Sequence, residues 1–158
     1  VTMDGAVTGV AVAGAGTSVG FAVSPLLARR VLPELVETGN YDHPFLGIRL
    51  VEVTPNVAEA NDLAEARGIM IVETTEDGPA GETLQAATGE TTVEGTPVPV
   101  GGDVLVELAG SRIDSNANLG TTLALELSPG DRVEAVVIRD GERRTVEVQI
   151  GARPDPQG

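Results

Sequence analysis

The chain lacks cysteine, lysine and tryptophan, and only 2% of its 158 residues are aromatic. Without cysteine it can form neither disulfide bonds nor thiolate metal sites. No apolar run approaches the roughly 20 residues needed to span a bilayer, and no basic stretch followed by an apolar run marks a signal peptide. Because aromatic residues are scarce, we expect a core of valine, leucine, isoleucine and alanine, for which the 41% hydrophobic content is sufficient.

Positive charge is also scarce. The ten basic residues are all arginine, against 24 acidic residues, so the net charge is −14. Such a surface repels phosphate groups, and we expect neither nucleic acids nor anionic membranes as partners. An acidic chain without lysine is typical of salt-adapted organisms, where salt screens the repulsion, and favours a salt-adapted archaeon as the source. An ordinary acidic domain from an organism with arginine-biased codons explains the same composition.

Groups that carry catalysis are nearly absent. The single histidine, His43, stands between Asp42 and Pro44 in an expected linker. The G-x-S-x-G spacing at residues 16–20 falls in the glycine-rich turn between two expected strands, not in the strand-to-helix turn of a nucleophile elbow. No spacing typical of a metal site is present. The glycines of residues 14–20 depart from the G-x-G-x-x-G dinucleotide fingerprint at Val19. The sequence therefore predicts no catalytic residue, no metal and no cofactor.

The first 39 residues predict a strand–strand–helix segment. Alternating small and apolar residues at 6–23 favour two strands joined by a glycine-rich turn. Ser24 and Pro25 are typical of a helix start, whereas Pro33 should kink or split that helix. Such a segment cannot bury a core alone, so we expect it to be the end of an incomplete domain. Residues 40–44 then predict a linker.

From residue 45 onward the pattern predicts an α+β domain. Strands are expected at 45–53, 68–75 and 101–110, and hairpins at 88–100 and at 131–150 with a turn at Asp140-Gly141. Short helices are expected at 54–63 and 115–127, and a turn with a one- to two-turn helix at 77–84. These elements favour a mostly antiparallel sheet in a small, partly open barrel. Residues 152–158 predict a disordered tail.

A glycine stands at an unusual place in the stretch FLGI, residues 45–48, where a strand is expected to begin. Glycine weakens a strand, so its presence favours a close approach of another group to the backbone. The backbone amides of Leu46, Gly47 and Ile48 could point into one concavity and bind an anion there.

An apolar groove beside that concavity completes the hypothesis. Side chains that alternate along the strand and recur along the helix at 115–127 would form it: Leu46, Ile48, Leu50, Leu119, Leu123 and Leu127. Such a groove fits a peptide that ends in an apolar residue and a free carboxylate, added as an extra strand beside residues 48–52. The alternative is that these side chains simply pack in the core, and spacing alone favours it.

Several motifs occur in the order found in one known family. FLGI resembles the carboxylate-binding loop of PDZ domains, and DGPAGETLQ, VGGDVLVELAGSRI and LSPGDRVEAVVIRDGERRTVEVQI resemble the rest of a bacterial or archaeal PDZ domain. The resemblance covers roughly residues 41–151, with the domain itself at 45–151, and implies a PDZ-like partly open barrel or sandwich. An insertion around TGETTVEGTPVP departs from the family pattern and has no assigned role.

The first 48 residues are similar to the end of the trypsin-like protease domain of the HtrA family, running into its PDZ domain. In that family the nucleophile lies in a G-N-S-G-G-P segment shortly before the strand that residues 1–10 resemble. The chain begins just after that point, so no catalytic residue carries over. We expect this fragment not to be an enzyme and its parent chain to be a serine endopeptidase. The resemblance implies carboxylate binding by the amides of Leu46, Gly47 and Ile48.

The HtrA family implies a module that binds C-terminal or exposed apolar peptide segments, and that presents substrates to the protease or regulates it. Its partners would be unfolded-protein C-termini and the protease domain of the same chain, within a homo-oligomeric parent. It would act outside the cytoplasm, with any membrane anchor upstream of Val1. Arg49, next to the loop, would disfavour basic peptides, whereas the acidic surface would favour them. Two other interpretations stay open: an assembly domain with no peptide ligand, and a PDZ scaffold with a non-protease parent.

Overall fold

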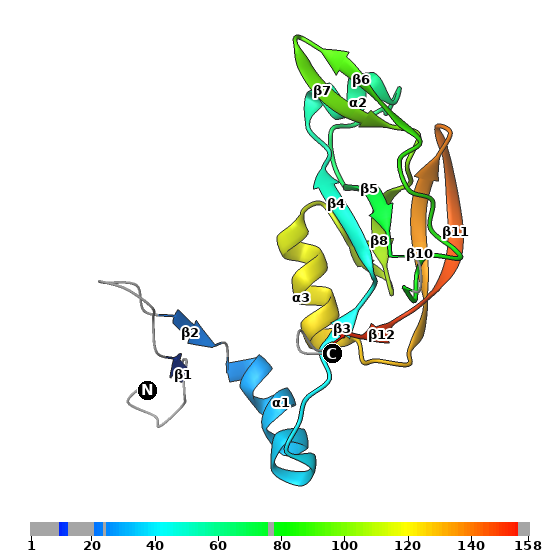
Figure 1. Ribbon diagram of the computed structural model, residues 1–158. Helices are drawn as coiled ribbons and strands as arrows, with labels where there is room; N and C mark the ends of the chain where they lie inside the picture. Colours follow the sequence, from blue (N-terminus) through cyan, green and yellow to red (C-terminus); the bar gives the residue numbers. More distant parts are fainter. Residues whose placement is uncertain (1–9, 13–20, 24, 76–77, 155–158) are drawn as a thin grey trace. The chain divides into compact units, whose positions relative to one another are not determined.

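The computed structural model describes residues 10–12, 21–23, 25–75 and 78–154 (Figure 1). The chain divides into two compact units, Val1–Asp42 and His43–Gly158. In the first unit, β1 (Val10–Val12) pairs antiparallel with β2 (Phe21–Val23), and α1 (Pro25–Thr38) follows. α1 runs through Pro33 as one helix, so Pro33 does not split it, and a kink at this residue stays a prediction. The glycine-rich stretch at 14–20 lies outside the described residues.

The second unit has ten described strands and two described helices. The strands are β3 (Pro44–Phe45), β4 (Ile48–Glu52), β5 (Ile69–Thr74), β6 (Gly89–Val93), β7 (Thr96–Val100), β8 (Val104–Leu108), β9 (Ser111–Arg112), β10 (Arg132–Arg139), β11 (Glu142–Gln149) and β12 (Gly151–Ala152). The helices are α2 (Pro55–Ala60) and α3 (Asn116–Glu126). The main sheet has the order β11-β10-β8-β5-β4, with β9 beside β8, and its strands pair antiparallel. The expected α+β fold with a mostly antiparallel sheet is confirmed, and β4 is an edge strand.

The sheet carries a hydrophobic core on each face, because side chains alternate along its strands. In β5, Ile69 and Ile71 belong to the core that contains Leu119 of α3, whereas Met70 belongs to a second core. That second core contains Val57 of α2 and Val98 of β7. The expected aliphatic core is present, with Met70 as its only buried methionine among the described residues.

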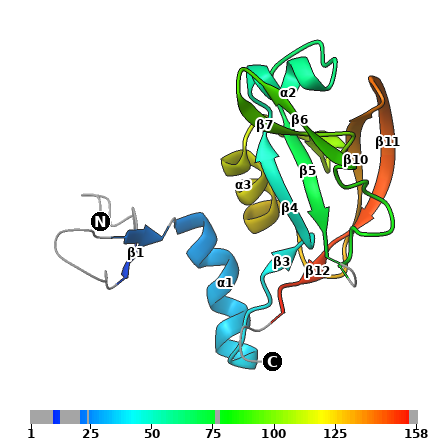
Figure 2. The same ribbon diagram turned by 45° about the horizontal axis from the view of Figure 1, so that its top comes forward.

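The insertion around residues 88–100 folds as the predicted hairpin, β6 paired with β7. The hairpin lies against α2 at one end of the unit, and β3 and β12 lie at the other end (Figures 1 and 2). Its buried side chain, Val98, helps to cover the second face of the sheet. The predicted turn of the other hairpin is also confirmed, since Asp140 and Gly141 both have positive φ, 53° and 76°.

Two expectations for irregular segments are wrong. Residues 79–84 form turns rather than a helix, because the amide of Ala80 donates to a loop carbonyl, Leu46 O, and that of Gly81 to Gly78 O. The tail predicted to be disordered from residue 152 begins as part of β12, and the amide of Arg153 donates to His43 O at 2.9 Å. This pairing also makes Pro44, expected in the linker, the first residue of a strand.

Candidate functional site

The loop before β4 has its carbonyl groups turned toward the body of the domain. Thr75 N–H donates to Gly47 O at 2.7 Å, and Ala80 N–H donates to Leu46 O at 3.2 Å. In a trans peptide the N–H points opposite to the C=O of the same plane. The amides of Gly47 and Ile48 therefore point away from Thr75 and Ala80, as an anion-binding loop requires.

The outer edge of β4 is open. Ile48 lies opposite Thr74 in the ladder with β5. The hydrogen bond of this part of the ladder joins their neighbours, from Thr75 N–H to Gly47 O, so Ile48 and Thr74 do not hydrogen-bond to each other. The N–H and C=O of Ile48 consequently face away from β5. Among the described strands β4 pairs only with β5, so these groups are available to an added strand.

The role expected for Gly47 differs from the one that the structure indicates. A Cβ at this position would lie 2.9 Å from the Cα of Gly78 and 3.2 Å from the Cδ of Pro79. Its φ is +69°, a left-handed conformation that side chains rarely adopt. Glycine is therefore needed for the turn and for contact with residues 78–79, which lie behind the loop, whereas its role in the approach of a ligand stays a prediction.

A cavity of about 210 Å³ lies between the loop, β4 and α3. Its lining residues are Pro44, Phe45, Leu46, Gly47, Ile48, Leu50, Asn116, Leu119, Gly120, Leu123 and Arg153. Leu46 and Leu119 are almost fully buried, whereas Ile48, Leu50 and Leu123 are only half-buried. A groove with a buried floor and accessible apolar walls can hold an apolar side chain.

Five of the six side chains expected in the pocket line this cavity, and the sixth does not. Leu127 ends α3 as its C-cap residue and is packed in the core on the same face of the sheet. Leu127 was expected in the groove because it follows Leu119 and Leu123 at helical spacing, but the helix ends at Glu126. Five further lining residues were not expected, namely Pro44, Phe45, Asn116, Gly120 and Arg153, of which Phe45 and Gly120 were recognisable as neighbours of expected ones.

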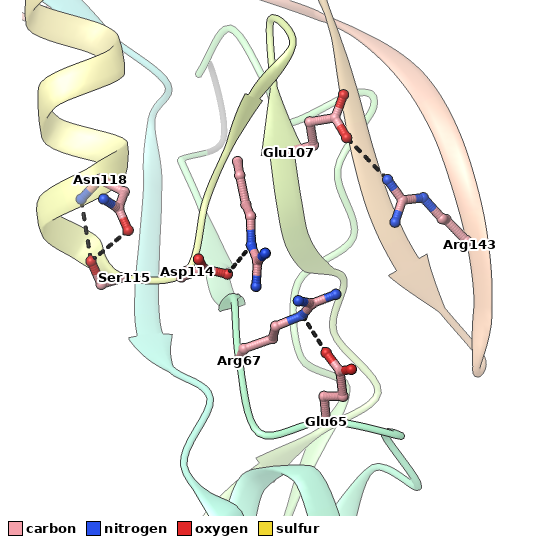
Figure 3. A network of polar contacts seen from close by, with 8 residues as sticks. Glu65, Arg67, Glu107, Asp114, Ser115, Asn118 and Arg143 are labelled. Atoms are coloured by element: carbon pink, nitrogen blue, oxygen red, sulfur yellow. Dashed lines mark hydrogen bonds and ion pairs between the residues drawn. The ribbon is translucent and has the colours of Figure 1, made fainter.

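Hydrogen bonds at the N-terminus of α3 fix the far end of the groove. Ser115 is the N-cap, and its Oγ accepts from Asn118 N–H at 3.3 Å (Figure 3). Glu52, the last residue of β4, accepts from Asn116 N–H through Oε1 at 2.9 Å. A carboxylate at a helix N-terminus is stabilising, and here it ties the first turn of α3 to β4.

The charges around the groove are partly compensated. Arg49 Nη1 lies 2.8 Å from both carboxylate oxygens of Glu73, with 76% and 56% of the two side chains exposed. An ion pair this exposed adds little stability, but it offsets the charge expected to disfavour basic peptides. His43 is exposed and lies outside the cavity lining.

A buried ion pair holds the turns at 79–85 that support the loop. Asp103 is 0% exposed and accepts from Arg139 Nε at 2.7 Å and Nη2 at 2.6 Å. It also accepts from Gln85 N–H, and Arg139 donates to Thr83 O. The hydrogen bond to Asp103 raises the pKa of Arg139 above its ordinary value, so the guanidinium stays charged.

A larger cavity, of about 450 Å³, lies elsewhere, between the end of α2, the β7–β8 connection and the β10–β11 turn. The side chain of Asn61 lines it but is engaged by Val57 O, Pro99 O and the amide of Gly101. Neither β4 nor the loop at 46–48 contributes a residue to its lining, so this cavity is separate from the open edge of β4 and from the outward-turned loop amides.

Within the described residues, no three His, Asp or Glu side chains cluster closely enough to hold a metal ion. In the same part of the chain, no helix is both long and apolar enough to cross a bilayer.

A family model described as "PDZ domain" matches residues 44–150. A probable periplasmic serine endoprotease, DegP-like, of Halomonas elongata is 30% identical over 137 residues, which is 87% of this chain and 26% of that protein. The corresponding protein of Pseudomonas fulva is 29% identical over 161 residues, 99% of this chain and 30% of that protein. The chain therefore spans less than a third of either curated relative.

Solved structures give the same picture. The HtrA-type protease AlgW with a decapeptide has a TM-score of 0.68 and 25% identity, covering 96% of this chain and 44% of that chain. The same protease with a tripeptide has a TM-score of 0.65 and 25% identity, covering 98% and 48%. The two curated relatives come from bacteria. The comparisons support neither the archaeal origin nor the salt-adapted habitat expected from composition.

Proposed function

We propose that this chain, which belongs to the PDZ domain family over residues 44–150, is a peptide-binding module of a serine endoprotease. Its relatives are HtrA- and DegP-like serine endoproteases. The observation that carries the proposal is the apolar cavity beside an open strand edge, with two loop amides turned outward at its end. The AlgW structures contain peptides, which supports peptide binding for this chain as well.

The peptide binds by adding a strand to β4. The N–H and C=O of Ile48 form the first main-chain bonds, and pairing continues toward Glu52. The terminal carboxylate lies against the amides of Leu46, Gly47 and Ile48, where partial positive charges converge. Main-chain bonding gives affinity for many sequences, and the free carboxylate selects for chain ends.

The last side chain of the peptide enters the cavity between β4 and α3. Its walls are Leu46, Ile48, Leu50, Leu119 and Leu123. Burying an apolar side chain there contributes roughly 25 cal/mol per Å² of apolar surface removed from water. We expect apolar C-terminal residues to be preferred over charged ones.

The first unit is proposed to be the end of a trypsin-like protease domain, at residues 1–39. Its helix α1 leaves large apolar side chains exposed, among them Leu26, Leu32 and Val36, the last at 82%. Apolar side chains of this kind need a covering partner. The protease domain of the same chain is that partner, and substrate delivery or regulation of a serine endopeptidase is the role of the module.

The relatives described as periplasmic support action outside the cytoplasm. Binding of protein C-termini in that compartment fits a role in protein quality control within a homo-oligomeric parent.

Fluorescence anisotropy with labelled decapeptides tests the proposal. Five peptides ending in Ala, Val, Leu, Ile or Phe are compared, each with a free and with an amidated C-terminus. We expect saturable binding of at least one apolar-ended peptide, tighter for the free form. Equal, negligible binding of all ten would overturn the proposal and favour an assembly domain without a peptide ligand.

A further inference from the structure

We infer that Arg153 supplies the positive charge that recognises the C-terminal carboxylate of the peptide, an inference that rests on the proposed function. Eleven residues line the cavity between the loop, β4 and α3, and Arg153 is the only one with a charged side chain. It comes from the end of the domain and is distant in sequence from the loop at 46–48.

Pairing of the two terminal strands of the domain places Arg153 beside the loop. Gly151 lies opposite Phe45 and Ala152 opposite Pro44 in the β12–β3 ladder. The amide of Arg153 then donates to His43 O at 2.9 Å, which extends the pairing by one residue. The backbone of Arg153 is thus fixed next to the segment that enters the carboxylate-binding loop.

The charge of Arg153 is not used within the described part of the domain. Residues 43–158 contain eight arginines. Seven of them form ion pairs with carboxylates: Arg49, Arg67, Arg112, Arg132, Arg139, Arg143 and Arg144. Among the described residues Arg153 has no such pair, and its side chain is exposed at the cavity.

A cation is needed at this position because the rest of the molecule repels carboxylates. The net charge is −14, and residues 40–46, which lead into the loop, contain no arginine but include Asp42. Loop amides carry only partial charges. A guanidinium presents paired N–H donors that match a carboxylate and attracts it during approach.

The test uses the complete chain and the peptide that binds most tightly among the five free forms, with its amidated counterpart. Arg153→Gln removes the charge, and Arg153→Lys keeps it. Arg143→Gln is the matched control: it makes the same change of charge on β11, at the opposite edge of the sheet from β4. Thermal melting checks that each variant is folded.

We expect Arg153→Gln to weaken binding of the free-carboxylate peptide about three- to tenfold at low salt, as for a partly exposed charge-assisted contact. Binding of the amidated peptide should not change. Arg153→Lys should keep most of the affinity, and added salt should reduce the difference between the wild type and Arg153→Gln.

Two results would overturn the inference while leaving the proposed function intact. One is Arg153→Gln binding the free-carboxylate peptide as tightly as Arg143→Gln does. The other is an equal loss for the free and amidated peptides, since recognition would then not involve the carboxylate. If the wild type binds neither peptide, the proposed function itself fails.

Discussion

A side chain at Gly47 would meet the backbone of Gly78 behind the loop instead of the groove, and its φ of +69° is left-handed. We therefore expect Gly47→Ala to lower the free energy of unfolding by at least the roughly 1–2 kcal/mol that this conformation costs an L-residue. Urea denaturation measures the change.

The control for Gly47→Ala is Gly95→Ala, at a hairpin turn with φ of +80° and open space around the added Cβ. It isolates the conformational cost, so Gly47→Ala should be the more destabilising of the two. If the two variants are equally stable and only Gly47→Ala loses peptide binding, glycine serves the approach of the ligand after all.

Gly120 lies within α3, where glycine costs about 1 kcal/mol relative to alanine. No packing demands it, because a Cβ there would have nothing within 4 Å. It lines the groove on the same helix face as Asn116 and Leu123. We infer that its missing side chain keeps the groove wide.

Gly120→Ala should therefore raise the melting temperature while shifting peptide preference from Phe toward Val or Ala at the last position. Melting curves and the ratio of affinities for the peptides ending in Phe and Val measure the two effects. A higher melting temperature with an unchanged ratio would show that Gly120 does not set the width of the groove.

At the level of strands and helices, a hydrogen bond to Glu52 holds α3 against β4. The Oε1 of Glu52 accepts from Asn116 N–H at 2.9 Å. Glu52→Ala removes this acceptor and should cost about 1 kcal/mol of stability, similar to a lost helix cap, and should weaken peptide binding because α3 is no longer fixed. Glu90→Ala, on the exposed hairpin strand β6, removes the same charge and should change neither. Stability and anisotropy measurements on both variants decide whether the bond positions the groove.

The pair of Arg139 and Asp103 anchors the supporting turns to β8 and β10. Arg139→Gln leaves the fully buried Asp103 carboxylate without its partner, so we expect a loss of roughly 3–5 kcal/mol. Arg143 lies on the same β10–β11 hairpin as Arg139. Arg143→Gln breaks its exposed pair with Glu107 of β8 (Figure 3) and should cost less than about 1 kcal/mol. Similar losses in urea denaturation would contradict this account.

The raised pKa of Arg139 predicts how its contribution depends on pH. A group whose pKa is raised in the folded state contributes fully below its unfolded pKa and loses that contribution only as pH rises through the folded value. The folded-state and the unfolded-state pKa of Arg139 both lie far above neutrality. Titration of Arg139 should therefore not change the stability difference between the wild type and Arg139→Gln from neutral to mildly alkaline pH.

Local patterns predicted most elements of this fold. The helix starts expected at residues 54 and 115, the turn Asp140-Gly141 and the hairpin at 88–100 all depend on neighbouring residues, so local patterns located them. The helix expected at 77–84 failed because the amide of Ala80 bonds to Leu46 O, a contact between distant segments.

Local sequence patterns also predicted part of the candidate site, but not all of it. Leu46, Ile48, Leu50, Leu119 and Leu123 follow from strand and helix periodicity. Arg153 could not be found this way, because β12–β3 pairing brings it to the groove from more than 100 residues away. The nearby Gly151 and Pro154 are typical of a disordered chain end, so the sequence did not indicate that this segment pairs with β3.

For the whole molecule, net charge governs the response to salt. With 24 acidic against ten basic residues, repulsion outweighs the exposed ion pairs, and both are screened by added salt. We expect the melting temperature to rise between about 0.01 M and about 1 M NaCl, as the Debye length shortens from roughly 30 to 3 Å. A falling melting temperature would mean that the ion pairs dominate.

The central claim is that a peptide C-terminus docks on the loop at 46–48 and extends along β4. The most direct measurement is an NMR titration of ¹⁵N-labelled protein with the tightest free-carboxylate peptide. We predict that the largest amide shifts occur at Gly47 and Ile48 and continue along β4 and the facing side of α3, with slower hydrogen exchange at Ile48. Shifts confined to the larger cavity around Asn61 and Asp140, or no shifts at a saturating peptide concentration, would contradict the account.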